Sequence, residues 1–193
     1  MVVHDQDDPI MVIQTRRALQ SDRQAISEVV FAAFGKEQGR EISQLILDLY
    51  ADESAKPLIS LVATVDDEVV GHILFTTAHI KDSARKVSSA ILAPLSVHPK
   101  HQGKGIGGRL VQAGLSDLQK AGVDLVFVLG HPSYYPKCGF KPAGKQRLFA
   151  PHPIPRKNAD AWMVKELRPG VSAQITGQVV CAGALDDPRH WRE

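Results

Sequence analysis

Residues 95–108 read Leu-Ser-Val-His-Pro-Lys-His-Gln-Gly-Lys-Gly-Ile-Gly-Gly, and this stretch decides the fold. An apolar segment ends at Val97, a proline-broken turn follows, and four glycines fall within the last six residues. Apolar residues then recur at every third or fourth position, which predicts an amphipathic helix that starts at the glycines. They are Ile106, Leu110, Val111, Leu115 and Leu118. A strand, a glycine-rich turn and a helix therefore follow one another here.

The segments around this stretch predict a mixed α/β fold with a central, mostly antiparallel sheet and helices on both of its faces. Three strands before the turn form an antiparallel meander: 58–65, 69–80 and 87–97. The other expected elements are strands at 11–16, 124–130, 161–167 and 176–182, and helices at 22–33, 39–50 and 132–137. Pro94 lacks a backbone N–H, so it predicts a local irregularity, such as a bulge, in the strand at 87–97.

The composition is that of a folded chain without strong charge bias. Of the 193 residues, 44% are hydrophobic and 23% are charged, which disfavours disorder. Because 23 Lys and Arg oppose 21 Asp and Glu, we expect no nucleic-acid partner. The sequence shows no signal peptide and no bilayer-spanning apolar run, so we expect a cytoplasmic protein without membrane contact. His98 and His101 have metal-ligand spacing but lie in a proline-broken loop, and we expect no metal.

Two nucleotide-binding patterns compete for the glycine-rich turn, and neither fits. Gly103, Gly105 and Gly108 have the Gly-x-Gly-x-x-Gly spacing of a dinucleotide site. Five residues, however, separate Val97 from Gly103, whereas a dinucleotide site follows its strand directly. A P-loop needs Lys-Ser or Lys-Thr after a glycine, and the sequence has neither. A helix start with glycines still exposes unpaired N–H groups, so the turn predicts an anion site.

Two motifs, in a fixed order, carry a resemblance to a known family. Gln102-x-x-Gly105-x-Gly107 follows the strand that ends Leu95-Ser-Val, and Tyr135-Pro-Lys-Cys-Gly-Phe comes after the next strand. This combination resembles the Gcn5-related N-acetyltransferase (GNAT) superfamily, and within it the YhbS-like group.

The resemblance implies that acetyl-CoA is the acyl donor. In this family the strand before the turn splays from the next strand in a V, here 87–97 from 124–130, and exposes backbone N–H groups to the coenzyme. The residues that would bind the coenzyme are Leu95, Ser96, Val97, Gln102, Gly103, Lys104, Gly105, Ile106 and Gly107. The resemblance covers residues 10–168 as the N-acetyltransferase domain and leaves 169–193 as a C-terminal extension, which can add a strand.

Tyr135 is the expected general acid, because the resemblance places a catalytic tyrosine there. A phenol with a pKa of about 10 stays protonated at neutral pH and can donate to a thiolate, whose reference pKa is about 8.5. The alternative is a tyrosine that only packs between helix and sheet. Cys138 allows a covalent acetyl-cysteine route, although such a cysteine is more often a small buried apolar residue. No general base is identified: many family members carry Glu near position 93, and this chain has Ala93.

These features predict an acetyl-CoA-dependent N-acetyltransferase that acts on a primary amine by direct attack in a ternary complex. The alternative is a non-catalytic module that binds or senses acyl-CoA on the same fold. The acceptor, a small-molecule amine or a peptide amine, is expected to contact the helices at 22–33 and 39–50. The strand at 176–182 could pair with a second copy at a sheet edge, so a homodimer is compatible with the sequence.

Overall fold

The computed structural model describes residues 12–81, 83 and 85–192. One path through the sheet uses β1 (Ile13–Arg17), β2 (Ile59–Val65), β3 (Glu68–Ile80), β4 (Ser89–Val97), β5 (Leu125–Leu129), β6 (Lys141–Pro142) and β8 (Trp162–Glu166). Their order is β1–β2–β3–β4–β5–β8–β6, and each neighbouring pair on this path is antiparallel except β4 and β5. The predicted first strand begins at residue 11, which lies outside the described residues.

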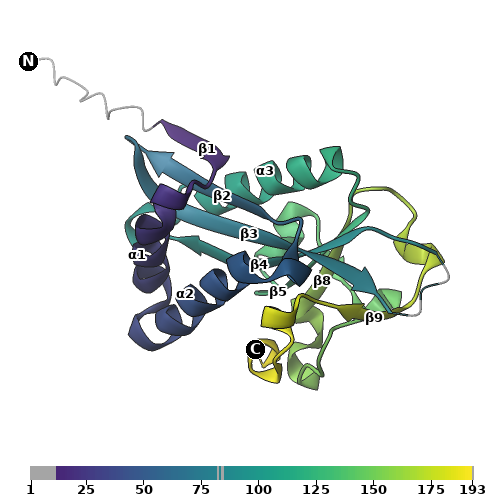
Figure 1. Cartoon of the computed structure of the whole chain (residues 1–193). Helices are drawn as coiled ribbons and strands as arrows, with labels where there is room; N and C mark the ends of the chain where they lie inside the picture. Colours follow the sequence, from purple (N-terminus) through teal and green to yellow (C-terminus); the bar gives the residue numbers. More distant parts are fainter. Residues whose placement is uncertain (1–11, 82, 84, 193) are drawn as a thin grey trace, which may run out of the picture.

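Helices cover both faces of the sheet. α1 (Arg23–Phe34) and α2 (Lys36–Ala51) pack on one face, and α3 (Ile106–Lys120) packs on the other (Figure 1). Leu110 and Leu115 of α3 share a buried core with Phe75 of β3, as their helical spacing requires. The fold is therefore the mixed, mostly antiparallel sheet with helices on both faces that the sequence predicts.

The junction between α1 and α2 is tighter than predicted. Gly35, with φ of 78°, ends α1, but α2 begins at the next residue and not at residue 39. Gly39 explains the difference: a Cβ there would lie 2.9 Å from the Phe31 Cα, so the first turn of α2 packs directly on α1. An apolar pattern misses such a contact, because glycine adds no side chain to it.

β4 leaves β5 partway along its length. The two strands pair only as far as Leu92 opposite Val128. Against β3, the register of β4 shifts so that β4 holds one extra residue at 93–94. The local irregularity predicted from Pro94 is thus a bulge, and bulges bend the strand that carries them. The predicted V-shaped splay between the two strands is therefore present.

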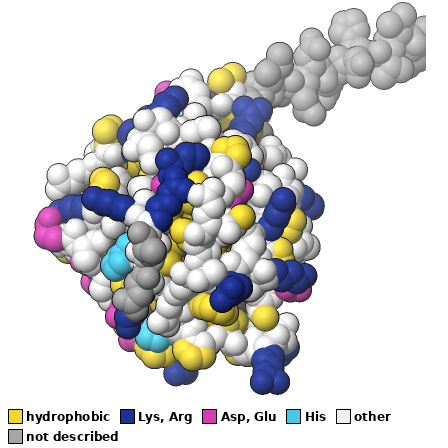
Figure 2. Space-filling view, turned by 90° about the vertical axis from the view of Figure 1, so that its right-hand side faces the viewer, with side chains coloured by type: hydrophobic (Ala, Val, Ile, Leu, Met, Phe, Trp, Pro, Cys, Tyr) yellow, Lys and Arg dark blue, Asp and Glu magenta, His cyan; other side chains and the backbone are white. Residues whose placement is uncertain are grey.

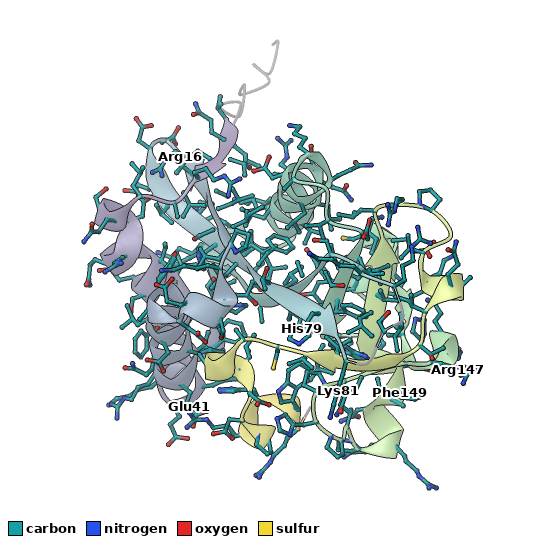
Figure 3. The ribbon with its side chains drawn as sticks, turned by 45° about the vertical axis from the view of Figure 1, so that its right-hand side comes forward. Arg16, Glu41, His79, Lys81, Arg147 and Phe149 are labelled. Carbon is teal, nitrogen blue, oxygen red and sulfur yellow. The ribbon has the colours of Figure 1, made fainter. Side chains whose placement is uncertain are left out.

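A short three-stranded corner extends the sheet. β9 (Gly177–Val180) lies between the end of β3, to which it is antiparallel, and β7 (Leu148–Phe149), to which it is parallel. His79, Lys81 and Phe149 lie at this corner (Figure 3). The strand predicted at 176–182 is thus present and pairs within the chain.

Residues after 168 also contribute to the core. We refer to residues 183–192, which hold two 3-10 turns, as the 183–192 segment. Its Trp191 indole is 3% exposed and lies 5.6 Å from the Trp162 ring. The same indole donates from Nε1 to the Leu185 carbonyl at 2.9 Å. The aromatic contact therefore joins the segment to β8, and the hydrogen bond within the segment orients the indole.

The surface of the molecule is uneven in charge. On the face shown in Figure 2, which is the right-hand side of Figure 1, most charged side chains are Lys or Arg. Among the described residues, no helix combines the length and the apolar character that crossing a membrane requires.

Candidate active site

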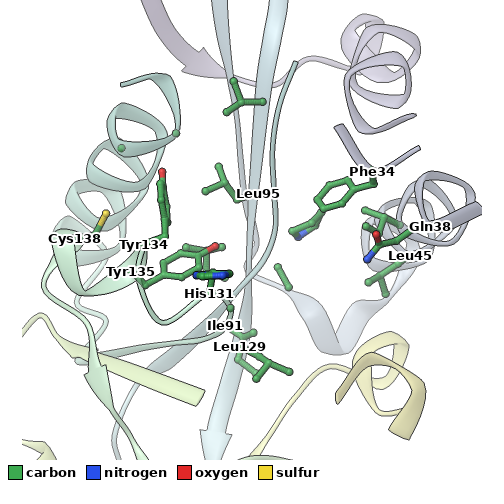
Figure 4. Close-up of a pocket in the computed structure, with 18 of the residues that line it drawn as sticks. Phe34, Gln38, Leu45, Ile91, Leu95, Leu129, His131, Tyr134, Tyr135 and Cys138 are labelled. Carbon is green, nitrogen blue, oxygen red and sulfur yellow. The ribbon is translucent and has the colours of Figure 1, made fainter. Parts of the chain in front are cut away.

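The splay between β4 and β5 opens into a cleft of about 1180 Å³. Residues from five parts of the chain line this cleft: the α1–α2 junction, the splayed half of β4, the glycine-rich turn, the stretch after β5 and the 183–192 segment. Phe34 and Gln38 stand on one wall, and Tyr134 and Tyr135 stand on the other (Figure 4). The cleft between β4 and β5 thus has one wall from α1 and α2 and a second wall from the stretch after β5.

The glycine-rich turn forms one end of the cleft. Gly103 and Gly105 have φ of 74° and 78°, in the left-handed region that suits glycine, and α3 starts directly after Gly105. A Cβ on either glycine would have no other described atom within 4 Å. The first N–H groups of a helix have no partner inside it and carry its partial positive charge. The turn can therefore hold an anion directly against the backbone.

The hydrogen bonds of β4 decide which of its N–H groups face the splay. His98 N donates to the carbonyl of Val70 in β3 at 2.8 Å. N–H groups along a strand alternate in direction, so that of Ser96 also points toward β3. Those of Leu95 and Val97 therefore point into the opening left by β5.

Seven of the nine residues predicted to bind a coenzyme line the cleft, and two do not. The seven are Leu95, Val97, Gln102, Gly103, Gly105, Ile106 and Gly107. Ser96 is 2% exposed, with its side chain in the interior, and Lys104 is not among the lining residues. Gln102 uses its amide within the protein, because Nε2 donates to the Val97 carbonyl at 3.0 Å.

Tyr135 belongs to the stretch after β5. The sequence predicts a helix at 132–137, but the structure has one 3-10 turn at Tyr135–Cys138, because Pro136 has no N–H to donate to the carbonyl of residue 132 as an α-helix requires. Left-handed Gly139, with φ of 87°, ends the turn. The Tyr135 side chain is buried, and a Cβ on Gly130 would lie 2.3 Å from its Cε2, so only glycine fits against the ring. Figure 4 shows the Tyr135 hydroxyl pointing into the cleft.

Tyr134 lines the cleft beside it. A Cβ on Gly107 would lie 2.4 Å from its hydroxyl, which therefore sits over the first turn of α3. Burial raises the pKa of Tyr134, so this phenol is protonated at neutral pH. The cleft thus holds one phenol at the helix start and a second against Gly130, at the end of β5.

Cys138 is buried, and this burial raises the pKa of its thiol. A raised pKa disfavours the thiolate that a covalent route needs. The His98 ring accepts a hydrogen bond from Lys100 N through Nδ1 at 3.3 Å, within its own loop. No set of three or more His, Cys, Asp or Glu side chains in the described ranges could hold a metal ion.

The cleft also contains residues that the sequence did not single out. Arg189, His190 and Trp191 of the 183–192 segment line it, as does Glu41 of α2. The sequence predicts that the second helix lies near an acceptor, but it assigns no such place to the 183–192 segment. The one signal in the sequence is Trp191 among charged residues. A tryptophan there indicates burial, but it does not indicate which part of the protein it packs against.

A sheet that opens between two parallel strands beside a glycine-rich helix start marks the class of acetyltransferases that use an acyl-coenzyme A. The family model described as "Acetyltransferase (GNAT) domain" matches residues 56–142, which include both motifs. The chain is also 43% identical over 163 residues to the uncharacterized N-acetyltransferase YjhQ of Escherichia coli, across 84% of this chain and 88% of the relative. The chain belongs to the GNAT family of N-acetyltransferases.

Two solved structures share nearly the whole fold. The GNAT family N-acetyltransferase YhbS from Escherichia coli, in complex with CoA, matches with a TM-score of 0.82 and 26% identity, over 95% of this chain and 97% of that one. A GNAT family acetyltransferase from Brucella melitensis, in complex with acetyl-CoA, matches with a TM-score of 0.70 and 28% identity, over 91% and 99%. The likeness therefore extends well beyond residues 56–142.

Proposed function

We propose that this chain binds acetyl-CoA in the cleft and transfers the acetyl group to a primary amine by direct attack in a ternary complex. One observation carries the proposal: the splayed half of β4 and the N-terminus of α3 open into the same cleft as Tyr135. The relatives crystallised with CoA and with acetyl-CoA support the choice of donor.

The residues present fit a ligand with a diphosphate. Gly103 and Gly105 leave a cradle that a Cβ would enter, and the N-terminus of α3 supplies N–H donors with positive potential. The N–H groups of Leu95 and Val97 would hold the pantetheine arm and the thioester carbonyl along β4. The thioester oxygen gains negative charge as the amine attacks, so a donor fixed at that oxygen lowers the barrier.

Tyr135 would act as the general acid. When the C–S bond breaks, the sulfur leaves as a thiolate that needs a proton, and a phenol with a pKa of about 10 keeps its proton until then. Packing against Gly130 holds the ring in one orientation, which a positioned donor requires. Proton transfer by a positioned group contributes typically about 10²–10⁴-fold to the rate.

The acceptor would enter between α2 and the 183–192 segment. Phe34 and Leu45 give this side apolar surface, and Glu41 adds a carboxylate. An apolar wall beside one carboxylate suits a small-molecule amine or a peptide amine that arrives as an ammonium ion.

Calorimetry with acetyl-CoA and thiol release across a panel of alkylamines, amino acids and lysine peptides test the proposal. We expect binding, turnover with at least one acceptor class, and initial-rate lines that intersect when both substrates are varied. Parallel lines and an acetylated enzyme would establish the covalent route through Cys138 instead. Tight binding without turnover on any amine would favour the acyl-CoA sensor, which Ala93 in place of the family's Glu keeps open.

A further inference from the structure

His131 lies at the opening between β4 and β5, at the same level as Leu95. The last paired residues of these two strands are Leu92 of β4 and Val128 of β5, and Leu95 and His131 each come three residues later. Both residues line the cleft. Since the N–H group of Leu95 points into the opening, a backbone donor borders it on the β4 side and an imidazole borders it on the β5 side.

The imidazole of His131 shares this part of the cleft with Tyr135. The Tyr135 ring packs directly against Gly130, the residue before His131, and the Tyr134 N–H donates to the His131 carbonyl at 3.0 Å. Figure 4 shows the rings of Tyr135 and His131 together in the cleft. His131 is an exposed residue, so a ligand in the cleft can reach its ring.

Ser133 fixes the tautomer of the His131 ring. The Ser133 N–H donates to His131 Nδ1 at 3.3 Å, and Ser133 Oγ lies 2.9 Å from the same ring nitrogen. A backbone N–H can only donate, so Nδ1 accepts, and Nε2 carries the proton of the neutral imidazole. His131 therefore offers the cleft an N–H donor on a ring that its own turn holds in place.

We propose that the Nε2–H of His131 and the N–H of Leu95 together hold the thioester oxygen of acetyl-CoA, as two donors from opposite sides of the splay. The proposal rests on the acetyltransferase function proposed above. The oxygen and the sulfur of a thioester are bonded to the same carbon, so a donor to the oxygen has to lie near the acid that serves the sulfur. His131 meets this condition, because the ring of Tyr135 packs on the residue before it.

The protons and electron pairs balance in this scheme. The lone pair of the neutral amine forms the C–N bond at the thioester carbon, and the π pair of the carbonyl moves to its oxygen. This oxygen then carries a negative charge, which two fixed donors stabilise. The pair returns as the C–S bond breaks, and the thiolate takes a proton from Tyr135. The nitrogen loses a proton to solvent, solvent restores Tyr135, and His131 keeps its proton throughout.

The infrared carbonyl stretch of bound acetyl-CoA tests the contact without turnover. A hydrogen bond to a carbonyl oxygen weakens the C=O bond and lowers its stretching frequency. With acetyl-CoA isotopically labelled at the carbonyl carbon, we expect a higher frequency in His131→Phe, which keeps a ring without the donor, than in the wild type. The frequency in His131→Gln, whose side-chain amide can donate, should lie between the two. Equal frequencies in the wild type and His131→Phe would overturn the inference.

The rate of turnover tests the same donor in the transition state. With the best alkylamine of the panel, we expect His131→Phe to lower kcat by about 10²–10³-fold, the range for one lost donor to a developing oxyanion. His131→Gln should recover at least about tenfold of this loss. The loss should be the same at pH 7 and pH 9, because the donor takes no proton from the amine. A loss that shrinks as the amine becomes neutral would assign His131 as a base and overturn its role as a donor.

His79→Phe is the matched control, because His79 is exposed at the β3–β9 corner and is not among the residues that line the cleft. It should keep both the infrared frequency and kcat of the wild type. His131→Leu repeats both measurements if His131→Phe unfolds. A wild-type protein that binds acetyl-CoA but acetylates no amine overturns the proposed function, whereas the infrared comparison still decides whether His131 holds the thioester.

Discussion

Tyr135 is held by contacts to its ring, with the Phe140 centroid 5.7 Å away, so Tyr135→Phe removes the hydroxyl and keeps the packing. We expect this variant to lower kcat by at least about 30-fold, because the departing thiolate loses its proton donor. Acetyl-CoA affinity, measured by calorimetry, should be nearly unchanged. The fall in kcat should be smaller with acyl donors whose leaving thiols are more acidic. If the variant kept more than half of kcat with chemistry rate-limiting, the acid would be another group or solvent.

At the residue scale, the sequence predicts the site residues that belong to a motif. It misses the residues whose place in the site depends on tertiary packing. Tyr135 follows from its place before Gly-Phe, and its location in the cleft agrees. The residues expected to bind the coenzyme include Leu95, Ser96 and Val97 in succession. In a strand, however, only every second N–H group points toward the splay. The place of His190 in the cleft wall could not be predicted, because it depends on where segments far apart in the sequence dock.

The start of α3 offers a test of the anion site with a matched control. Asp and Asn tolerate the left-handed conformation of Gly105 better than most residues and are nearly equal in size, so a comparison of the two variants isolates the charge. We expect Gly105→Asp to bind acetyl-CoA at least about tenfold more weakly than Gly105→Asn, a difference of about 1.4 kcal/mol. Calorimetry measures both affinities. Equal affinities would remove the diphosphate from this turn.

The entry to α1 depends on an ionised Asp22. This carboxylate accepts from the Leu19 N–H at 2.7 Å and from the Arg16 guanidinium at 2.6 Å. The hydrogen bond from Arg16 has the largest effect and lowers the pKa of Asp22; burial raises this pKa, and the hydrogen bond from Leu19 lowers it further. A lowered folded-state pKa gives stability that is present above the unfolded value of about 3.9 and is lost as the pH falls through the folded one.

We expect Asp22→Asn to reduce the free energy of unfolding at pH 7 by about 1 kcal/mol, because Arg16 is partly exposed and the pair is screened. The difference from wild type should shrink below about pH 4, where the wild-type carboxyl also becomes neutral. Urea denaturation at several pH values measures it. Glu53→Gln, which removes an exposed partner of Lys56, should cost less than about 0.5 kcal/mol. A gap that persists at low pH would contradict the role of ionisation.

At the element scale, the apolar periodicity identifies the long helices and the meander, because those faces are buried against one sheet. It fails where glycine or a single turn decides the local structure. α2 begins three residues before its predicted start, since Gly39 packs backbone on backbone. The predicted helix at 132–137 shortens to one 3-10 turn, since Pro136 cannot donate the hydrogen bond that an α-helix needs there.

For the whole molecule, Trp191 tests whether the 183–192 segment is part of the folded unit. Trp191→Ala should lower the free energy of unfolding by about 3 kcal/mol, since it empties a buried site against Trp162. Phe149→Ala, at a side chain 54% exposed, should change it by less than about 0.5 kcal/mol. Urea denaturation provides both values. If the two variants were equally stable, the indole would contribute no more than a surface ring.

The whole-molecule order of elements follows from the sequence, because the meander, the turn and the apolar strand each have a local signature. Residues 169–193 are expected from the sequence to form an extension of a 10–168 domain because the family resemblance covers only residues 10–168. Nothing local shows that Val179 and Trp191 belong to the same core as the sheet, since that core forms from residues distant along the chain.

The position of the 183–192 segment also fixes when the cleft becomes complete during synthesis. A ribosome makes the turn, β5 and Tyr135 before it makes β9 and the 183–192 segment, and a domain generally folds as a unit. Because β9 and this segment share a buried core with the sheet, we expect the glycine cradle to become stable only after the acceptor wall has left the exit tunnel. The ability to bind a coenzyme and the ability to hold an acceptor would then emerge together.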